Sequence, residues 1–216
     1  MTPDYNKAAT KAAETLIKYG VNSFPVSPIP ILKKMEHVLL VSFADVCSAS
    51  GVERKELVPL FGKGQDAVTS IHEEGGNLRY IVAYNGMLPH TMVNRALARE
   101  LGHIVLKHRD RTPEADAEAR CFSHHLLCPR PLIHTLQAIG IRITKDLLAN
   151  ITGVVSHCLF CLRHTPGTEV PARLNRFVRS QIMPFVMNFF DYYQETRYDD
   201  GSALADLGSY MEMYEE

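Results

Sequence analysis

The sequence predicts an α+β fold, in which a small, mostly antiparallel sheet packs on a central helix and the C-terminal part is helical. Residues 78–84 alternate as in a strand with one buried face, and Gly75 and Gly76 before them suit a hairpin turn. Residues 91–108 carry apolar side chains at intervals of three and four, as an amphipathic helix does. Helical spacing and helix-start signals recur after residue 112.

The composition is that of an ordinary globular protein. Its 216 residues are 46% hydrophobic and 22% charged, and the formal net charge is -1. This charge balance gives no overall attraction to nucleic acid or to a membrane surface, and no apolar run approaches the roughly 18 residues of a membrane-spanning helix. We therefore expect no direct nucleic-acid binding and no membrane association. Five cysteines without an apolar N-terminal signal region indicate reduced thiols in the cytoplasm.

The N-terminal half is expected to combine helices with the strands of the sheet. Thr2 suits a helix N-cap, Pro3 suits the first helical position, and Gly20 can end that helix. A proline-rich connection follows, and segments rich in Val and Leu beyond it predict strands. The expected elements are helices before Gly20 and at 31–35, strands at 37–43, 67–72 and 78–84, and one or two helical turns within 53–61.

The C-terminal half is expected to be helical. After the central helix, Thr112 supplies an N-cap, Pro113 a first helical position and Glu114 a first-turn acid, so a second helix starts here and ends before Pro129. The further expected helices are 131–139, 145–151, 154–163 and 171–194, with a tail from residue 197. We expect residues 1–164 to form one domain and residues 165–216 to form a C-terminal helix and acidic tail.

The central helix contains the sequence Arg99-Glu100-Leu101-Gly102-His103. Arg99 and His103 are one turn apart, so their side chains should be neighbours. The pattern is the zinc-peptidase motif His-Glu-x-x-His with its first residue changed. In the intact motif the two imidazoles bind zinc and the Glu is the general base. A guanidinium has no lone pair for a metal, so either the site is altered or the metal is absent.

The next helix offers a carboxylate of the kind that completes such a site. Glu118 follows His103 after fifteen residues, as a third ligand does in two-His, one-Glu zinc sites. Cys121 is one turn from Glu118, and His125 lies two turns along the same face. These two residues are candidate substitute ligands for the one missing at Arg99. Without this second helix, an Arg-Glu-x-x-His sequence most often indicates a solvated helix face.

With both helices in view, the sequence resembles the ImmA/IrrE family of zinc metallo-endopeptidases. The family pattern is His-Glu-Leu-Gly-His, followed by Glu-Ala-x-x-Phe-Ala-x-x-Leu-Leu-x-Pro. Residues 100–103 match the first part directly, and residues 81–85 look like the family's edge strand ending in Asn. The matches to the second part are Glu118, Ala119, Phe122, Leu126, Leu127 and Pro129. The resemblance covers roughly residues 8–163.

The resemblance implies a zincin-like fold and a cytoplasmic protein, of bacterial or phage origin, that cleaves a helix-turn-helix repressor of a mobile element or stress response. It implies Glu100 as general base and His103 and Glu118 as metal ligands, with Arg99 at the replaced ligand position. Two functions remain open. One is a metal-deficient pseudopeptidase that binds such a regulatory protein without a cofactor, and the other is an active zinc endopeptidase with an altered ligand set.

The charges of the site lead to two further expectations. Without a metal, Glu100 and Glu118 would face each other in a partly buried cleft, which is costly. We expect Arg99 to pair with one of them in place of the metal, and His103 to hydrogen-bond Glu118. We also expect a partner peptide to add a strand at the edge formed by the strand that ends at Tyr84.

Overall fold

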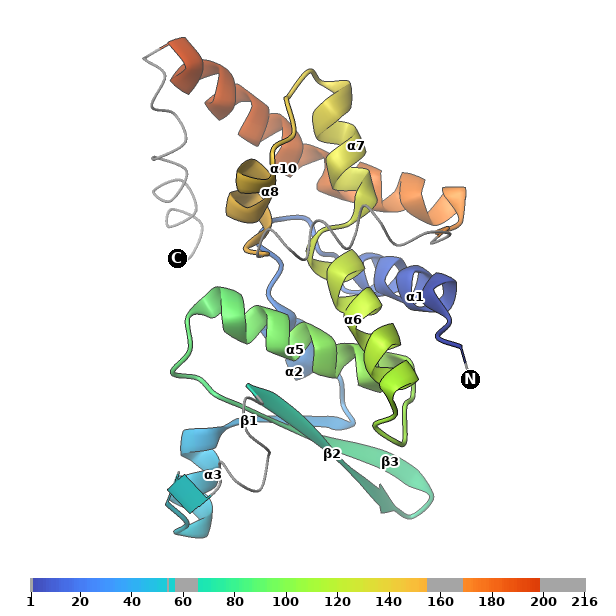
Figure 1. The fold of residues 1–216 in the computed structure, drawn as a ribbon, viewed down its shortest axis with the longest axis vertical. Helices are drawn as coiled ribbons and strands as arrows, with labels where there is room; N and C mark the ends of the chain where they lie inside the picture. The colour runs from blue at the N-terminus through green and yellow to red at the C-terminus, as the bar shows by residue number, and fades with distance from the viewer. Residues whose placement is uncertain (1, 54, 57–65, 155–168, 199–216) are drawn as a thin grey trace. The chain divides into compact units, whose positions relative to one another are not determined.

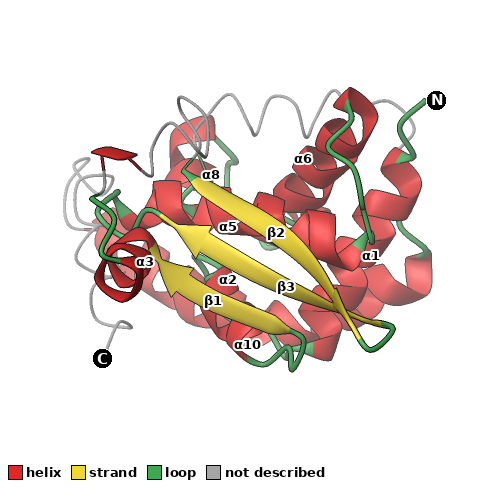
Figure 2. Ribbon diagram, turned by 90° about the horizontal axis from the view of Figure 1, so that it is seen from below, coloured by secondary structure: helices red, strands yellow, loops and turns green. Residues whose placement is uncertain are grey.

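Three strands form the sheet of this α+β protein: β1 (Val38–Ser42), β2 (Ala67–Glu74) and β3 (Asn77–Tyr84). β3 pairs with β2 in an antiparallel ladder of eight residue pairs and with β1 in a parallel ladder of five (Figure 2). Gly75 and Gly76 have φ angles of 59° and 79°, which a residue without a Cβ adopts at little cost. The predicted hairpin and the α+β class are confirmed.

The strand that ends at Tyr84 is central, which corrects the edge-strand expectation. β1 and β2 occupy its two sides, so a partner peptide has no free backbone to pair with there. Strand order depends on which segments pair across long stretches of chain, and the local alternation in β3 does not encode it. Within the described residues, the edges of the sheet belong to β1 and β2.

Helices α2 (Pro28–Lys33) and α5 (His90–Val105) pack with the sheet (Figure 1). The buried side of α5 carries Leu97, Leu101 and Ile104, at the spacing that the sequence predicts for a core-facing helix. α6 (Pro113–Leu127) begins after Thr112, whose side-chain oxygen accepts a hydrogen bond from the backbone N–H of Ala115 at 3.2 Å. The predicted start of this helix is thereby confirmed.

Helix α3 (Phe43–Ser50) was not expected. It starts directly where β1 ends, because Ser42 and Asp45 form a capping box: each side chain bonds to the other residue's backbone N–H. The predicted strand at 37–43 therefore gives way to a helix at Phe43. α3 packs against β1 and β3.

The remaining helices are α1 (Tyr5–Lys18), α7 (Arg130–Ala138), α8 (Lys145–Thr152) and α10 (Ala172–Tyr198). α10 packs against α1 and α7. The Gln181 side chain of α10 donates hydrogen bonds to the backbone carbonyls of Leu16, near the end of α1, and of Val21, just beyond it. The cap of α1 is Asp4 rather than Thr2, because the Asp4 carboxylate accepts the N–H of Lys7.

The computed structural model describes residues 2–53, 55–56, 66–154 and 169–198. Residues 1–3 and 27–123 belong to one compact unit, here called the first unit, and residues 4–26 and 124–216 to the second unit. The expected domain boundary after residue 164 lies outside the described residues. The same is true of nearly all of the helix expected at 154–163 and of most of the expected tail.

Gly102 sets how closely α5 and α6 approach. A Cβ at this position would lie 3.0 Å from the Ala119 carbonyl oxygen, 3.1 Å from its Cα and 3.1 Å from the Phe122 ring. Two of these three neighbours are helix backbone atoms, which cannot turn aside. Close packing of the two helices therefore favours glycine here.

We expect Gly102→Ala to lower the free energy of unfolding by about 1–3 kcal/mol, because overpacking forces the two helices apart. Urea denaturation measures the change. Gly86→Ala is the matched control, because a Cβ there would make only ordinary contacts at 3.6 and 3.8 Å. A Gly102→Ala variant as stable as the Gly86→Ala variant would contradict the close-approach argument.

Candidate functional site

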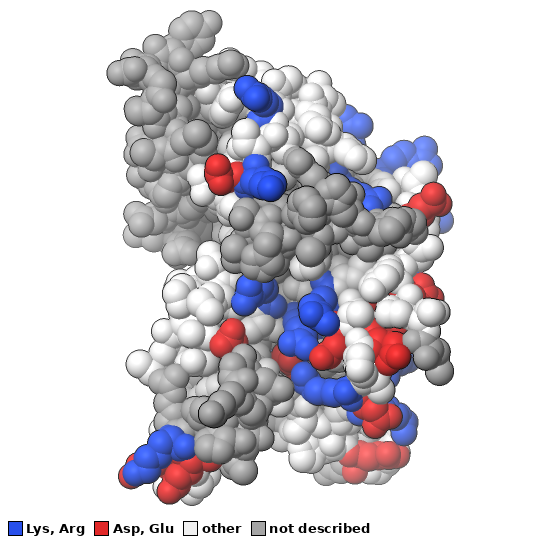
Figure 3. All heavy atoms as spheres, in the orientation of Figure 1, with Lys and Arg blue, Asp and Glu red and all other residues white. Residues whose placement is uncertain are grey.

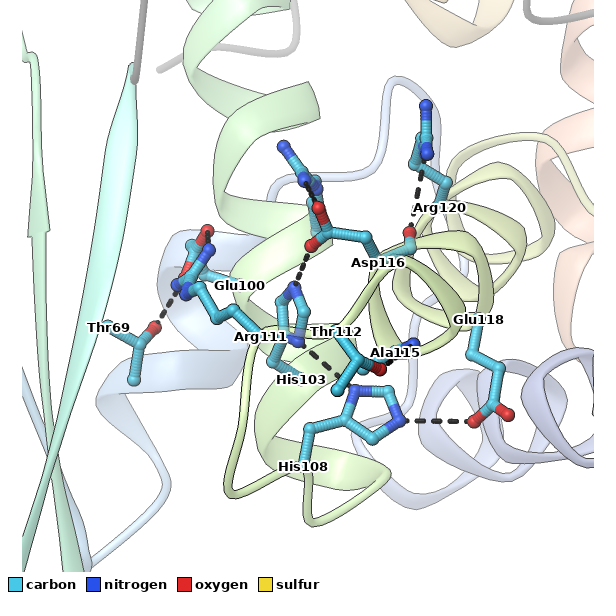
Figure 4. Close-up of polar contacts among 11 residues, drawn as sticks. Thr69, Glu100, His103, His108, Arg111, Thr112, Ala115, Asp116, Glu118 and Arg120 are labelled. Carbon is cyan, nitrogen blue, oxygen red and sulfur yellow. Dashed lines mark hydrogen bonds and ion pairs between the residues drawn. The ribbon is translucent and has the colours of Figure 1, made fainter. Parts of the chain in front are cut away.

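The Arg-Glu-x-x-His sequence lies on the second half of α5, and its side chains meet others from β2, from the α5–α6 connection and from the start of α6 (Figure 4). All of these residues belong to the first unit. The polar side chains that interact at the site are Thr69, Arg99, Glu100, His103, His108, Arg111, Asp116 and Glu118.

Glu100, the predicted general base, is buried with 2% of its surface exposed. Both of its oxygens contact the Arg111 guanidinium: Nη1 donates to Oε1 at 3.3 Å, and Nη2 makes a short contact with Oε2. The Thr69 hydroxyl also donates to Oε2 at 2.7 Å. The carboxylate is thus held in a forked ion pair with an additional hydrogen bond.

Arg99 pairs with Asp116, and not with Glu100 or Glu118 as expected. Its Nη2 lies 2.8 Å from Asp116 Oδ2. Burial alone would raise the pKa of Asp116, but the charge of Arg99 and its hydrogen bond outweigh burial and lower the pKa. Asp116 therefore carries a negative charge that Arg99 balances.

His103 and Glu118 do not contact each other directly, which corrects the expected hydrogen bond. His108 lies between them: its Nδ1 is 3.1 Å from Nδ1 of His103, and its Nε2 is 3.1 Å from Oε2 of Glu118. His103 is 5% exposed, and burial lowers its pKa to about 4, with the charge of Arg111 adding to the effect. His103 is therefore neutral at pH 7.

Lys107 explains how His108 reaches this position. It has a φ of 60°, and the backbone N–H of His108 bonds to the His103 carbonyl at 3.0 Å. This is the left-handed turn that often ends helices, usually with glycine at the position of Lys107. Because lysine stands there, the sequence gives little sign that the chain turns back towards the helix.

A cavity of about 260 Å³ opens beside these residues, between β2 and the end of α5. The residues lining it are Thr69, Ile71, Tyr80, His103, Ile104, His108, Arg109, Asp110 and Arg111. The wall combines the cationic Arg109 and Arg111 with the anionic Asp110 and with apolar side chains such as Ile71 and Ile104. Figure 3 likewise shows Lys and Arg side chains beside Asp and Glu side chains over the lower part of the view, with no extended patch of one sign.

The expected zinc ligands do not form a metal site in this arrangement. Arg99 brings a positive charge to the first ligand position, and Glu118 points to His108. Cys121 is buried on α6, and His125 lines a small cavity with Ala9 and Val178 in the second unit. In the part of the chain that the structure describes, no three His, Cys, Asp or Glu side chains are placed to hold a metal ion together.

Sequence reasoning missed four residues of the site. The family pattern selects Glu118 and not Asp116, which lies two residues earlier. His108 and Arg111 lie in a basic turn of the kind that is usually solvated, and Thr69 lies on a strand far away in sequence. The signals available were the spacing of five between His103 and His108 and the acid at position 116.

No protein-family model, no curated protein and no solved structure matches the chain. None of the described helices combines the length and apolar character needed to cross a membrane.

Proposed function

We propose that this chain is a metal-independent, non-hydrolytic protein of the cytoplasm that binds a regulatory protein, such as a helix-turn-helix repressor of a mobile element or a stress response. The pairing of Glu100 with Arg111 and Thr69 carries the proposal. The resemblance to peptidases that act on such repressors supplies the class of partner.

A zinc peptidase needs a carboxylate base with a lone pair free for water and a metal that polarises the scissile carbonyl. Here Arg111 and Thr69 occupy three of the about four acceptor sites of the Glu100 carboxylate, in a position that is 2% exposed. The guanidinium of Arg99 balances Asp116 next to His103. Two arginines of the chain itself thus balance the charges of Glu100 and Asp116, which favours binding over hydrolysis.

The β2 edge next to the cavity offers a place for an extended segment of the partner. β2 pairs with β3 on one side, and within the described residues its other side carries no strand. Thr69 and Ile71 are two positions apart on β2, so they lie on the same face of the strand, and both line the cavity, with Ile71 36% exposed. A segment that adds to this edge would place alternate side chains beside Ile71 and the exposed Arg109, which favours one apolar and one acidic side chain.

The test uses a purified helix-turn-helix repressor of a mobile element as the probe. We expect a complex whose affinity is the same with zinc and with EDTA, and a repressor that stays intact by mass spectrometry. Ile71→Lys should weaken binding about tenfold or more, because it places a charge at the β2 edge.

Leu39→Lys is the matched control, because Leu39 is 56% exposed on β1, the other edge strand. It should leave the affinity unchanged. Zinc-dependent cleavage of the repressor would contradict the non-hydrolytic proposal. Equal weakening by both lysine variants would contradict the choice of the β2 edge.

A further inference from the structure

We propose that Asp116, and not Glu118, occupies the third-ligand position of this peptidase-like site. Arg99 is then the cation that balances the charge of Asp116 in place of a metal. Glu118 is a positioning residue that acts on His103 through His108. The proposal concerns the layout of the site and does not depend on the identity of a binding partner. The experiments that test this proposal detect metal binding and imidazole tautomers, so their outcome is separate from that of the repressor experiment.

The geometry around Asp116 is the first support. Positions 99 and 103 are the two histidine positions of the zinc motif, and both side chains converge on this one carboxylate. Arg99 Nη2 lies 2.8 Å from Asp116 Oδ2, and His103 Nε2 lies 3.3 Å from Asp116 Oδ1. Figure 4 shows Glu118 directed elsewhere, towards His108.

Two unsatisfied atoms are the second support. His103 Nε2 and Asp116 Oδ1 are buried, and in the described part of the chain neither makes a hydrogen bond, although they lie 3.3 Å apart. Buried polar atoms without partners are rare in native proteins. Nitrogen and oxygen ligands at about 2.1 Å from a tetrahedral zinc lie roughly 3.4 Å from each other, so the pair has the spacing of two neighbouring ligands.

The hydrogen-bond pattern of the two imidazoles is the third support. When both imidazoles are neutral, they carry two N–H groups between them. The N–H at His108 Nε2 donates to the Glu118 carboxylate, so His108 Nδ1 has no proton. The N–H of His103 is then at Nδ1 and donates to His108 Nδ1. His103 Nε2 then keeps a bare lone pair directed at Asp116. A histidine that binds a metal through Nε2 needs this tautomer. Here His108 and Glu118 fix it by hydrogen bonds, as outer-shell partners do for metal-bound histidines.

Arg99 explains why the layout does not take up zinc in the unchanged chain. Its planar, permanently charged guanidinium matches the Asp116 carboxylate and repels a dication at the same point. An imidazole at position 99 would remove that charge and add a lone pair. The chain would then hold two histidines and one aspartate around a single point.

Cobalt(II), whose visible absorption reports four-coordinate binding, is the probe. We expect Arg99→His to bind one cobalt ion with strong visible bands, whereas the unchanged chain gives the spectrum of free cobalt. Adding Asp116→Asn should abolish the bands. Adding Glu118→Gln instead should preserve the bands and weaken affinity about tenfold, the usual cost of losing an outer-shell partner. Zinc competition gives the affinities.

A second measurement needs no change at position 99. Long-range ¹H–¹⁵N spectra of the unchanged chain should show His103 as the Nδ1–H tautomer, and Glu118→Gln should shift its tautomer balance. The proposal is overturned if His103 carries its proton on Nε2. It is also overturned if a folded Arg99→His variant binds no cobalt, or if Glu118→Gln abolishes the bands while Asp116→Asn keeps them.

Discussion

Replacing Arg111 with methionine should lower the free energy of unfolding by about 2–4 kcal/mol, because it leaves the Glu100 carboxylate buried without its cation. Thr69 would be the remaining donor to that carboxylate among the contacts seen at the site. The Arg111 side chain is itself 34% exposed, so water can replace part of its charge, and the expected loss stays below the upper end for fully buried pairs. Urea denaturation at pH 7 measures the loss.

A double variant and a neighbouring residue provide the controls. Adding Glu100→Gln to Arg111→Met should recover much of the lost stability, because the amide keeps an acceptor for Thr69 and removes the uncompensated charge. Arg109→Met, an exposed arginine in the same turn, should change stability by no more than about 0.5 kcal/mol. The account of Glu100 is contradicted if Arg111→Met is as mild as Arg109→Met.

Stability should fall steeply as the pH drops from 6.5 towards 4. Burial lowers the pKa values of His103 and His125 to about 4, with nearby positive charges contributing in each case. Both residues are neutral in the folded chain, whereas in the unfolded chain they take up protons near pH 6.5. The unfolded state therefore binds more protons throughout this window. The stabilisation present above pH 6.5 is lost on acidification, up to about 3 kcal/mol for each histidine.

Urea denaturation at pH 7 and at pH 4.5 measures this dependence. His125→Gln should flatten it by about half, because one of the two buried imidazoles no longer titrates. His90→Gln is the control, because His90 is exposed at the start of α5 and should leave the slope unchanged. Equal slopes for all three chains would contradict the assignment to buried histidines.

The sequence predicts the fold well where its signals are local. The spacing in α5, the cap and proline at the start of α6, and the glycine turn between β2 and β3 each depend on residues close together in the chain. The central place of β3 and the helix α3 depend on strand pairing and on a cap at the end of β1. Neither leaves a periodic pattern.

The site shows the same division. The motif correctly indicated that the α5 and α6 side chains meet, because Gly102 brings the helices close together. It did not indicate which charges pair. That choice depends on Asp116 lying opposite Arg99, and on the left-handed Lys107 that returns His108 to His103. A family pattern identifies which sequence positions belong to the site. Which charged groups pair there depends on the three-dimensional position of each side-chain end.

The zinc content of the purified chain tests the central claim, that arginine–carboxylate pairs take the place of a metal at this site. The chain would be produced with added zinc and purified without chelators. Elemental mass spectrometry would then measure the number of zinc ions per chain. We expect well below one zinc ion per chain, and a thermal stability that EDTA does not change. One zinc ion per chain, lost in the His103→Asn variant, would contradict the claim.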